Sequence, residues 1–430
     1  MAGIKEKFNY YNISTYFMFY KADLHIHSHY AKATSPQLTL ESLAKWAAIK
    51  GIQLLGTGDF THPAWLKEIK EKLKAAGNGF FHLKSGSNTN FCLSTEVSSV
   101  YVYGNKVRKN HNLVYMPDID AVERFNKKLS RYGDLASDGR PTVTLSSRDL
   151  LEMVLEISDY AYLVPAHAWT PWFSTLGSKG GYDSIEECFR DLTGNIFAIE
   201  TGLSSDPAMN WQWSRLDHLA MMSSSDAHSL HNLGREVNLF DTDFTYEGMF
   251  NAVKNKNGFS GTYEFFPEEG KYSFDGHRKC GISMSPKLSN GVNGICPVCK
   301  KQLTIGVMSR VSKLSDRSTA IKPANAPGFE YIIPLREILA EINGTGVNSI
   351  RVEKTYTDAI SFFGNEFALL KEAPIDDIRK YHAALGEAIL RMRLGKVNRV
   401  AGYDGLYGRI TLFEKDELQK NKLIQASLFA

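Results

Sequence analysis

Residues 20–240 repeat one pattern, in which short apolar runs alternate with longer amphipathic stretches. The apolar runs YKADLHIH, IQLLGTGDF and IFAIETG are typical of strands. LTLESLAKWAAIKG is typical of a helix that ends at Gly51, because glycine is favoured just beyond a helix C-terminus. Repeated strand–helix units predict an α/β protein with a parallel sheet or a barrel of seven or eight strands.

Histidines and acidic residues lie at the C-terminal ends of these apolar runs. They are His25, His27, Asp59, Glu96, His167, Glu200, Asp226 and His228. In a (β/α) barrel these ends share one face, which is where active sites are built. We therefore expect these side chains to meet although they are far apart in the chain.

The spacing of His25 and His27 predicts a metal site. Residues two apart in a strand point the same way, so both imidazoles face one side. Asp226 and His228 repeat this spacing. The two oxygens of Glu96 can bridge two cations.

His111 and His167 would add nitrogen ligands. A mixture of nitrogen and oxygen ligands suits Zn²⁺, Mn²⁺ or Fe²⁺. Clustered cations of this kind typically hydrolyse phosphate esters. We therefore predict catalytic roles for Glu96, Asp226 and His228, around the water that attacks phosphorus.

A second metal site is predicted near residue 290. His277 and Cys280 form one close pair, and Cys296 and Cys299 form another, which is how a structural tetrahedral Zn²⁺ site is built. Five cysteines with this clustering fit a reducing cytoplasm better than a disulfide framework. No apolar run approaches the roughly 18 residues of a membrane span, so we expect no membrane segment.

The zinc segment is strongly basic. Residues 271–322 hold ten lysines and arginines against two acids, a formal charge of +8, whereas the whole chain carries +3. This asymmetry indicates a polyanionic partner, although a solvated basic face is the alternative. The predicted DNA contacts are Lys279, Lys300, Lys301, Arg310 and Arg317.

These parts divide the chain. We expect a catalytic barrel over 20–260, the basic zinc module over 271–322, a mainly helical DNA- or lesion-recognition domain over 330–420 and a flexible tail over 421–430.

The motifs DLHIHS, TGD, LSTEVS, NHNLVYMP, VPAHAW and SSSDAH resemble, in order, those of the PHP superfamily (polymerase and histidinol phosphatase). The resemblance implies a distorted (β/α)7 barrel with two or three divalent ions (Zn, Mn or Mg). It assigns His25, His27, Glu96 and Asp226 to one ion, Glu96, His111 and His167 to another, and Asp59 and His228 to a third.

The chain departs from that pattern at two places. Ala31, Lys32 and Ala33 stand where a third histidine is usual, and Thr57-Gly58-Asp59 replaces the usual T-D-H. The third ion would therefore be held differently, with help from His62. Glu200 would support the ligands rather than bind metal itself.

The order of parts resembles the endonuclease Q family, because HRKCGIS, CPVCKKQLTIGV, FFGNEFALL and VAGYDGLYGRI follow the barrel motifs. This resemblance implies a metal-dependent endonuclease that incises double-stranded DNA 5′ to uracil, hypoxanthine, xanthine and abasic sites. Two alternatives remain: a histidinol-phosphate-like phosphatase, and a non-catalytic nucleic-acid-binding protein. The first leaves the basic zinc segment unexplained.

An enzyme that inspects a base is expected to extrude it into a pocket with aromatic walls. The candidates are Trp169 and Trp172, just after His167, and Tyr403 and Tyr407 in GYDGLYG. Packing in the core or in a loop is the alternative for each.

The segment Gln425-Ala426-Ser427-Leu428-Phe429 resembles the pentapeptide by which bacterial repair and replication proteins bind the sliding clamp. Gln425, Leu428 and Phe429 are the predicted contacts, and Ala426 departs from the more usual leucine.

Overall fold

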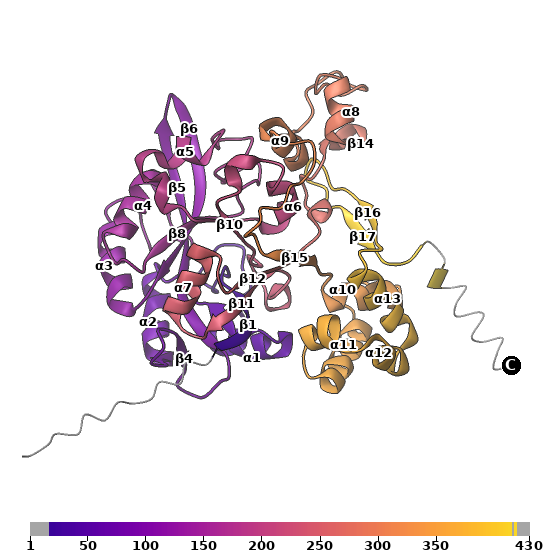
Figure 1. Cartoon of the computed structure of the whole chain (residues 1–430), viewed down its shortest axis with the longest axis horizontal. Coiled ribbons are helices and arrows are strands. Elements are labelled where there is room, and N and C mark those ends of the chain that lie inside the picture. The colour runs from indigo at the N-terminus through magenta and orange to yellow at the C-terminus, as the bar shows by residue number, and fades with distance from the viewer. Residues whose placement is uncertain (1–16, 415–416, 419–430) are drawn as a thin grey trace, which may run out of the picture.

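The structure is a computed structural model that describes residues 17–414 and 417–418 (Figure 1). Most strands join one mixed sheet in the order β15-β12-β11-β1-β2-β5-β4-β3, with β6 and β7 paired to β5 and β8 paired to β6. Its strands are β1 (Phe17–Asp23), β2 (Leu54–Gly56), β3 (Leu73–Ala75), β4 (Phe81–Leu83), β5 (Asn90–Tyr103), β6 (Lys106–Met116), β7 (Thr142–Val143), β8 (Tyr162–Pro165), β11 (Val237–Asp243), β12 (Phe259–Glu264) and β15 (Gly328–Tyr331).

Helices cover the outside of this sheet (Figure 1). They are α1 (Leu40–Lys50), α2 (Pro63–Lys72), α3 (Ile119–Leu129), α4 (Ser147–Leu155), α5 (Ile185–Phe189), α6 (Pro207–Asn210) and α7 (Tyr246–Asn255). Gly51 ends α1 in the left-handed conformation, with φ 87°, as its position in the sequence predicts. The side chains of Thr39, Asp118 and Ser146 cap the N-termini of α1, α3 and α4.

The α/β class is confirmed, but the strands do not all run parallel. β1, β2 and β5 are parallel neighbours, whereas β11 is antiparallel to β1 and β6 is antiparallel to β5. The short strands β9 (Ala198–Glu200) and β10 (Ala220–Met222) form a separate parallel pair. A closed seven-stranded barrel therefore stays a prediction.

Aromatic side chains fill the interior below the strand ends. Tyr20 stacks on Phe240, and Tyr115 stacks on Tyr162, with ring centroids 5.1 and 4.6 Å apart. All four are buried. Because these aromatic side chains fill the interior, the polar side chains lie at the C-terminal ends of the strands.

The chain after β12 forms two further parts (Figure 1). One contains β13 (Asp275–His277), β14 (Ile282–Met284), α8 (Pro286–Gly291) and α9 (Val307–Leu314). The other contains α10 (Leu335–Asn343), α11 (Ile350–Phe363), α12 (Ile375–Tyr381) and α13 (Ala383–Arg393), followed by the pair β16 (Asn398–Val400) and β17 (Arg409–Thr411). β15 lies between these two parts in sequence and pairs in parallel with β12. Among the described residues, no helix is both long and apolar enough to span a bilayer.

Candidate metal centre

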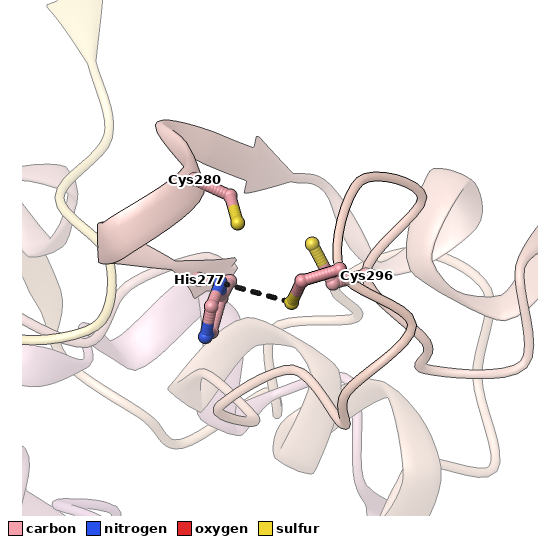
Figure 2. A group of neighbouring side chains, drawn as sticks. His277, Cys280 and Cys296 are labelled. Carbon is pink, nitrogen blue, oxygen red and sulfur yellow. Dashed lines mark hydrogen bonds between the residues drawn. The ribbon is translucent and has the colours of Figure 1, made fainter.

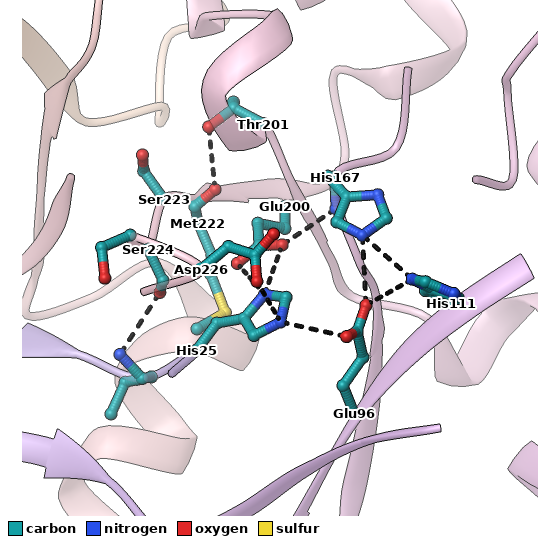
Figure 3. Close-up of polar contacts among 12 residues, drawn as sticks. His25, Glu96, His111, His167, Glu200, Thr201, Met222, Ser223, Ser224 and Asp226 are labelled. Carbon is teal, nitrogen blue, oxygen red and sulfur yellow. Dashed lines mark hydrogen bonds and ion pairs between the residues drawn. The ribbon is translucent and has the colours of Figure 1, made fainter. Parts of the chain in front are cut away.

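The predicted ligands come together at the strand ends (Figure 3). β1 ends at Asp23, so His25 and His27 lie just beyond it. A bridge between Ile26 and Ala227 joins this segment to the one that carries Asp226. Residues two hundred positions apart are thereby placed side by side, as the strand-end pattern predicts.

Four ligand atoms converge on one point. The Nε2 atoms of His25 and His27 lie 3.5 and 3.4 Å from Glu96 Oε2, and 3.6 and 3.1 Å from Asp226 Oδ1. Both Nε2 atoms and Asp226 Oδ1 are buried without a hydrogen-bond partner. Buried polar atoms are nearly always paired, so three unpaired atoms aimed at one another fit a cation between them.

Glu96 connects this group to a second one. Its Oε1 lies 2.6 Å from His111 Nδ1 and 3.1 Å from His167 Nε2. Figure 3 shows Glu96 between His25 and the pair His111 and His167. In both groups the ligand atoms lie within 4.8 Å of one another, so the carboxylate of Glu96 is placed to bridge two ions.

A carboxylate supports each histidine of the H-x-H pair from behind. Glu200 lies 3.0 Å from His25 Nδ1, and Asp59 lies 2.9 Å from His27 Nδ1. This pairing favours a proton on Nδ1 and leaves Nε2 free to ligate, which is how outer carboxylates orient metal-binding histidines. The position of Glu200 agrees with a supporting role.

The residues predicted for a third ion are arranged differently. The second oxygen of Asp59 accepts hydrogen bonds from the backbone N–H and hydroxyl of Ser28, at 2.6 and 2.7 Å, so both of its oxygens are already engaged. His228 Nδ1 lies 2.9 Å from the carbonyl oxygen of Asp226, and His62 Nε2 lies 3.1 Å from that of Ala136. Within residues 17–414, neither metal-like group of the barrel includes Asp59, His62 or His228.

The centre favours positive charge. Burial opposes protonation of His25, but Glu200, Asp226 and Glu96 raise its pKa well above the usual value. Burial would raise the pKa of Glu96, yet His111, Arg140 and His25 hold it well below the usual range. Carboxylates that stay ionised at this depth provide the field that a divalent cation needs.

Three site residues carry backbone strain. Asp59, His167 and Asp226 have φ values of 49°, 29° and 47°, a region that side chains other than glycine rarely adopt. Each follows the end of a strand. Strain of this kind clusters at functional sites, where the surrounding fold imposes it.

Sequence reasoning missed Arg140. Its guanidinium lies 3.2 Å from Glu96 Oε2 and remains 25% exposed, so it reaches the centre from the solvent side. Arg140 stands in a loop with no motif around it, and no signal in one sequence distinguishes it from other arginines.

The four predicted zinc ligands also converge. His277, Cys280, Cys296 and Cys299 place one ligand atom each within 4.8 Å of the others, and Figure 2 shows three of them pointing together. Cys299 Sγ lies 3.6 Å from His277 Nδ1. Three sulfurs and one nitrogen are the donor set of a structural zinc site.

The predicted DNA contacts fall into two groups. Lys279, Lys300 and Lys301 are exposed. Arg310 is buried and pairs with Asp183 at 2.7 Å, whereas Arg317 pairs with Asp217 at 2.6 Å. These two arginines attach the zinc module to the barrel, so their contacts do not favour a role in binding DNA.

The predicted pocket aromatics also differ in position. Trp169 is fully buried and donates a hydrogen bond to Asn210. Its position therefore fits packing in the core rather than the wall of a pocket. Trp172 is exposed and packs edge-on against Tyr272, 5.0 Å away. Tyr407 is exposed beside Lys271, and Tyr403 bridges to Phe274. Gln425, Leu428 and Phe429 lie outside the described residues.

Comparisons with known proteins extend this description. The family model of the MJ0043 C-terminal domain matches residues 334–396. Uncharacterized protein YqxK of Bacillus subtilis is 30% identical over 410 residues, which cover 90% of this chain and 98% of YqxK. Uncharacterized protein MJ0043 of Methanocaldococcus jannaschii is 32% identical over 253 residues, which cover 57% of this chain and only 31% of MJ0043.

Two solved structures match nearly the whole chain. The lesion-specific endonuclease PfuEndoQ from Pyrococcus furiosus has a TM-score of 0.83 at 32% identity, covering 94% of this chain and 97% of PfuEndoQ. An endonuclease Q complex with a 27-mer duplex and an abasic lesion at the active site has a TM-score of 0.82 at 32% identity, covering 92% and 97%.

The fold and its clusters define an α/β protein with a histidine–carboxylate centre and a candidate zinc site. The chain belongs to the endonuclease Q family.

Proposed function

We propose that the protein is a metal-dependent DNA repair endonuclease that cuts double-stranded DNA on the 5′ side of uracil, hypoxanthine, xanthine and abasic sites. The observation that carries the proposal is the convergence of the unpaired His25, His27 and Asp226 atoms in a chain that matches PfuEndoQ over 94% of its length. The related endonuclease Q complex holds a duplex with an abasic lesion at its active site, which supports the class of substrate.

The proposal assigns a task to each part of the chain. Residues 20–260 would form the distorted (β/α)7 catalytic barrel, 271–322 the basic zinc module, and 330–420 the domain that recognises DNA or the lesion. Trp172 and Tyr272, together with Tyr403 and Tyr407, would line the place where an extruded base is inspected.

His25, His27, Glu96 and Asp226 would hold one divalent ion, and Glu96, His111 and His167 a second. Divalent ions in such a site lower the pKa of water and neutralise charge on a phosphate. Glu200 and Asp59 keep the two ligating histidines in one tautomer and orientation. Glu96 stays ionised because of its cationic neighbours, which a bridging ligand requires.

Two further side chains would act on the substrate directly. Arg140 presents a fixed cation beside Glu96, where it would bind a non-bridging oxygen of the scissile phosphate. His228 is 31% exposed and lies next to Asp226, and it would exchange a proton with the attacking water or the leaving oxygen.

One experiment separates this proposal from its alternatives. The protein is incubated with Mn²⁺ and a labelled duplex that holds one uracil, beside a duplex without a lesion and a phosphomonoester. We expect nicking only 5′ to the uracil. Turnover of the monoester alone would identify a small-molecule phosphatase, and binding without turnover a non-catalytic protein.

Replacement of a proposed ligand tests the centre itself. We expect Asp226→Ala to lose nicking by at least a hundredfold, while its affinity for the duplex changes little because most affinity comes from phosphate contacts elsewhere. Nicking by Asp226→Ala at the wild-type rate, with unchanged metal content, would remove this centre from the mechanism.

We also propose the bacterial sliding clamp as a partner, through residues 425–429. Support comes only from the likeness of Gln425, Leu428 and Phe429 to the clamp-binding pentapeptide. Clamp is titrated with the protein and with a copy that lacks residues 425–430. Equal affinity of the clamp for the two proteins would show that residues 425–429 do not bind it.

A further inference from the structure

The hairpin of β5 and β6 extends well beyond the metal centre that it helps to build. Glu96 lies on β5 and His111 on β6, and the two strands remain paired to their ends at Tyr103 and Lys106. At roughly 3.4 Å per residue, the tip lies about 17 Å beyond His111. In Figure 1 the hairpin projects past the neighbouring helices.

One face of this hairpin carries both the ligands and an apolar pair. Side chains two residues apart share a face, and Ser98 pairs with His111. Glu96 and His111 therefore share their face with Val102 and Val107, which pair with each other near the tip. Val102 is 71% exposed and Val107 is 55% exposed, so the apolar pair is open to solvent.

The opposite face of the hairpin packs against Tyr182. The hydroxyl groups of Tyr101 and Tyr182 lie 2.8 Å apart, and the guanidinium of Arg108 stacks 4.0 Å from the Tyr182 ring. Gly104 and Asn105 form the turn with φ values of 59° and 57°, the left-handed pair of a tight two-residue hairpin. The exposed pair thus lies beside a tight turn, on a strand pair whose other face packs against Tyr182.

Positively charged side chains line a cavity beside the tip of the hairpin. A cavity of about 800 Å³ lies between the hairpin, residues 177–187 and α9. Its charged lining comprises Lys106, Arg108, Lys179, Arg310 and Lys313 against Asp183 and Glu187. Since Asp183 already pairs with Arg310, the exposed lysines leave this groove positive, as a phosphate backbone requires.

We propose that the tip of this hairpin is a wedge that enters duplex DNA beside the lesion. Val102 and Val107 would pack against a base step and unstack it, and the lysines of the adjoining groove would bind the phosphates of one strand. Apolar side chains inserted between base steps open a duplex in this way, and extrusion of a base requires such opening. The wedge rests on the proposed function, because it positions DNA for the same centre.

The test compares two duplexes and two variants. Val102→Ser/Val107→Ser removes the apolar pair, and its high exposure predicts little loss of stability. Phe19→Ser is the control, because Phe19 is 49% exposed and lies on β1 near the end of the strand that points away from the metal centre. One duplex holds a uracil within paired flanks, and the other holds the same uracil between mismatched flanks that are already open.

We expect the double variant to lose at least tenfold in kcat/KM on the paired duplex and less than threefold on the opened duplex, whereas Phe19→Ser matches wild type on both. A 2-aminopurine beside the uracil should brighten when wild type binds and not when the double variant binds.

An equal loss on both duplexes, no loss on either, or an unchanged fluorescence rise would overturn the wedge. A fall in self-association caused by the double variant, with both duplex assays unchanged, would instead identify the pair as a contact between copies and would also overturn it. If wild type nicks neither duplex but the fluorescence still separates the variants, the proposed function fails and the wedge stands.

Discussion

Each histidine of the H-x-H pair has its own supporting carboxylate, and the two supports come from different parts of the chain. Glu200 ends β9 and contacts His25, whereas Asp59 follows β2 and contacts His27. The conformation of a ligand is therefore set by residues that need not touch the metal. Asp59, which the motif resemblance assigns to a third ion, has both oxygens engaged by His27 and Ser28 in this structure.

The first prediction concerns Glu200. Glu200→Gln keeps the shape but removes the charge behind His25, so we expect affinity for Mn²⁺ to fall ten- to a hundredfold. Calorimetric titration of the metal-free protein measures it. Glu264→Gln is the matched control, since Glu264 is a buried carboxyl that hydrogen-bonds to Thr201 and Ser223 rather than to a histidine. Equal Mn²⁺ affinity of Glu200→Gln and Glu264→Gln would show that Glu200 does not support metal binding.

The second prediction uses Glu264 itself. Burial, with Asp206 nearby, raises the pKa of Glu264 to about 8. The unfolded carboxyl ionises near pH 4.5, so the folded state binds a proton that the unfolded state has lost. The free energy of unfolding should therefore fall as pH rises from about 4.5 to about 8.

Glu264→Gln cannot ionise, so its free energy of unfolding should fall less over this pH range. Urea unfolding at several pH values measures the difference. Parallel curves for wild type and Glu264→Gln would show that Glu264 is ionised in the folded protein.

At the scale of elements, the sequence predicts best what is local. Gly51 ends α1 because a helix C-terminus has a short-range signal. Each pair of predicted zinc ligands is close in sequence, and the structure brings the two pairs together. The antiparallel direction of β6 has a local signal that the repeated strand–helix pattern obscures, because Gly104 and Asn105 form a two-residue link that is typical of a hairpin and too short for a parallel crossover.

Other features depend on contacts between distant residues. The helical content of residues 330–420 is predicted, but the division between α12 and α13 at His382, whose side chain caps α13, is not. Composition alone cannot tell that Arg310 and Arg317 are paired with the barrel while Lys300 is exposed. Arg140 reaches Glu96 across 44 positions, so only the fold identifies it.

The third prediction concerns the zinc module. This small segment has few buried apolar residues, so its fold should depend on the metal. We expect Cys296→Ser to lose one zinc per chain and to make residues 271–322 sensitive to protease, while the barrel keeps its Mn²⁺ affinity. Elemental analysis measures the bound zinc, and limited proteolysis measures the sensitivity of residues 271–322 to protease. Cys188→Ala, which alters a buried cysteine outside the cluster, should keep its zinc, and retention of zinc by Cys296→Ser would argue against the site.

At the scale of the whole molecule, charge is divided between the parts. Residues 271–322 carry +8 while the chain carries +3 in total, so the remainder is net negative. The zinc module lies beside the barrel and joins it through the pairs Arg310–Asp183 and Arg317–Asp217. A duplex that reaches the centre would thus meet a basic surface held in a fixed place rather than a loosely tethered one.

This division of charge gives the last prediction. Each lysine that neutralises a phosphate releases counterions, and contributes about 0.9 to the slope of log affinity against log salt. Lys279, Lys300 and Lys301 are exposed on the zinc module. If all three contact phosphates, their replacement by alanine should lower the slope by about 2.7 and weaken binding at low salt. The matched control replaces Lys45, Lys74 and Lys127, which are exposed on the helices and strands around the barrel. Binding of a lesion-containing duplex is measured over a series of salt concentrations, with Ca²⁺ in place of Mn²⁺ to slow cleavage. Equal slopes for the two triple variants would place the duplex on another face of the molecule.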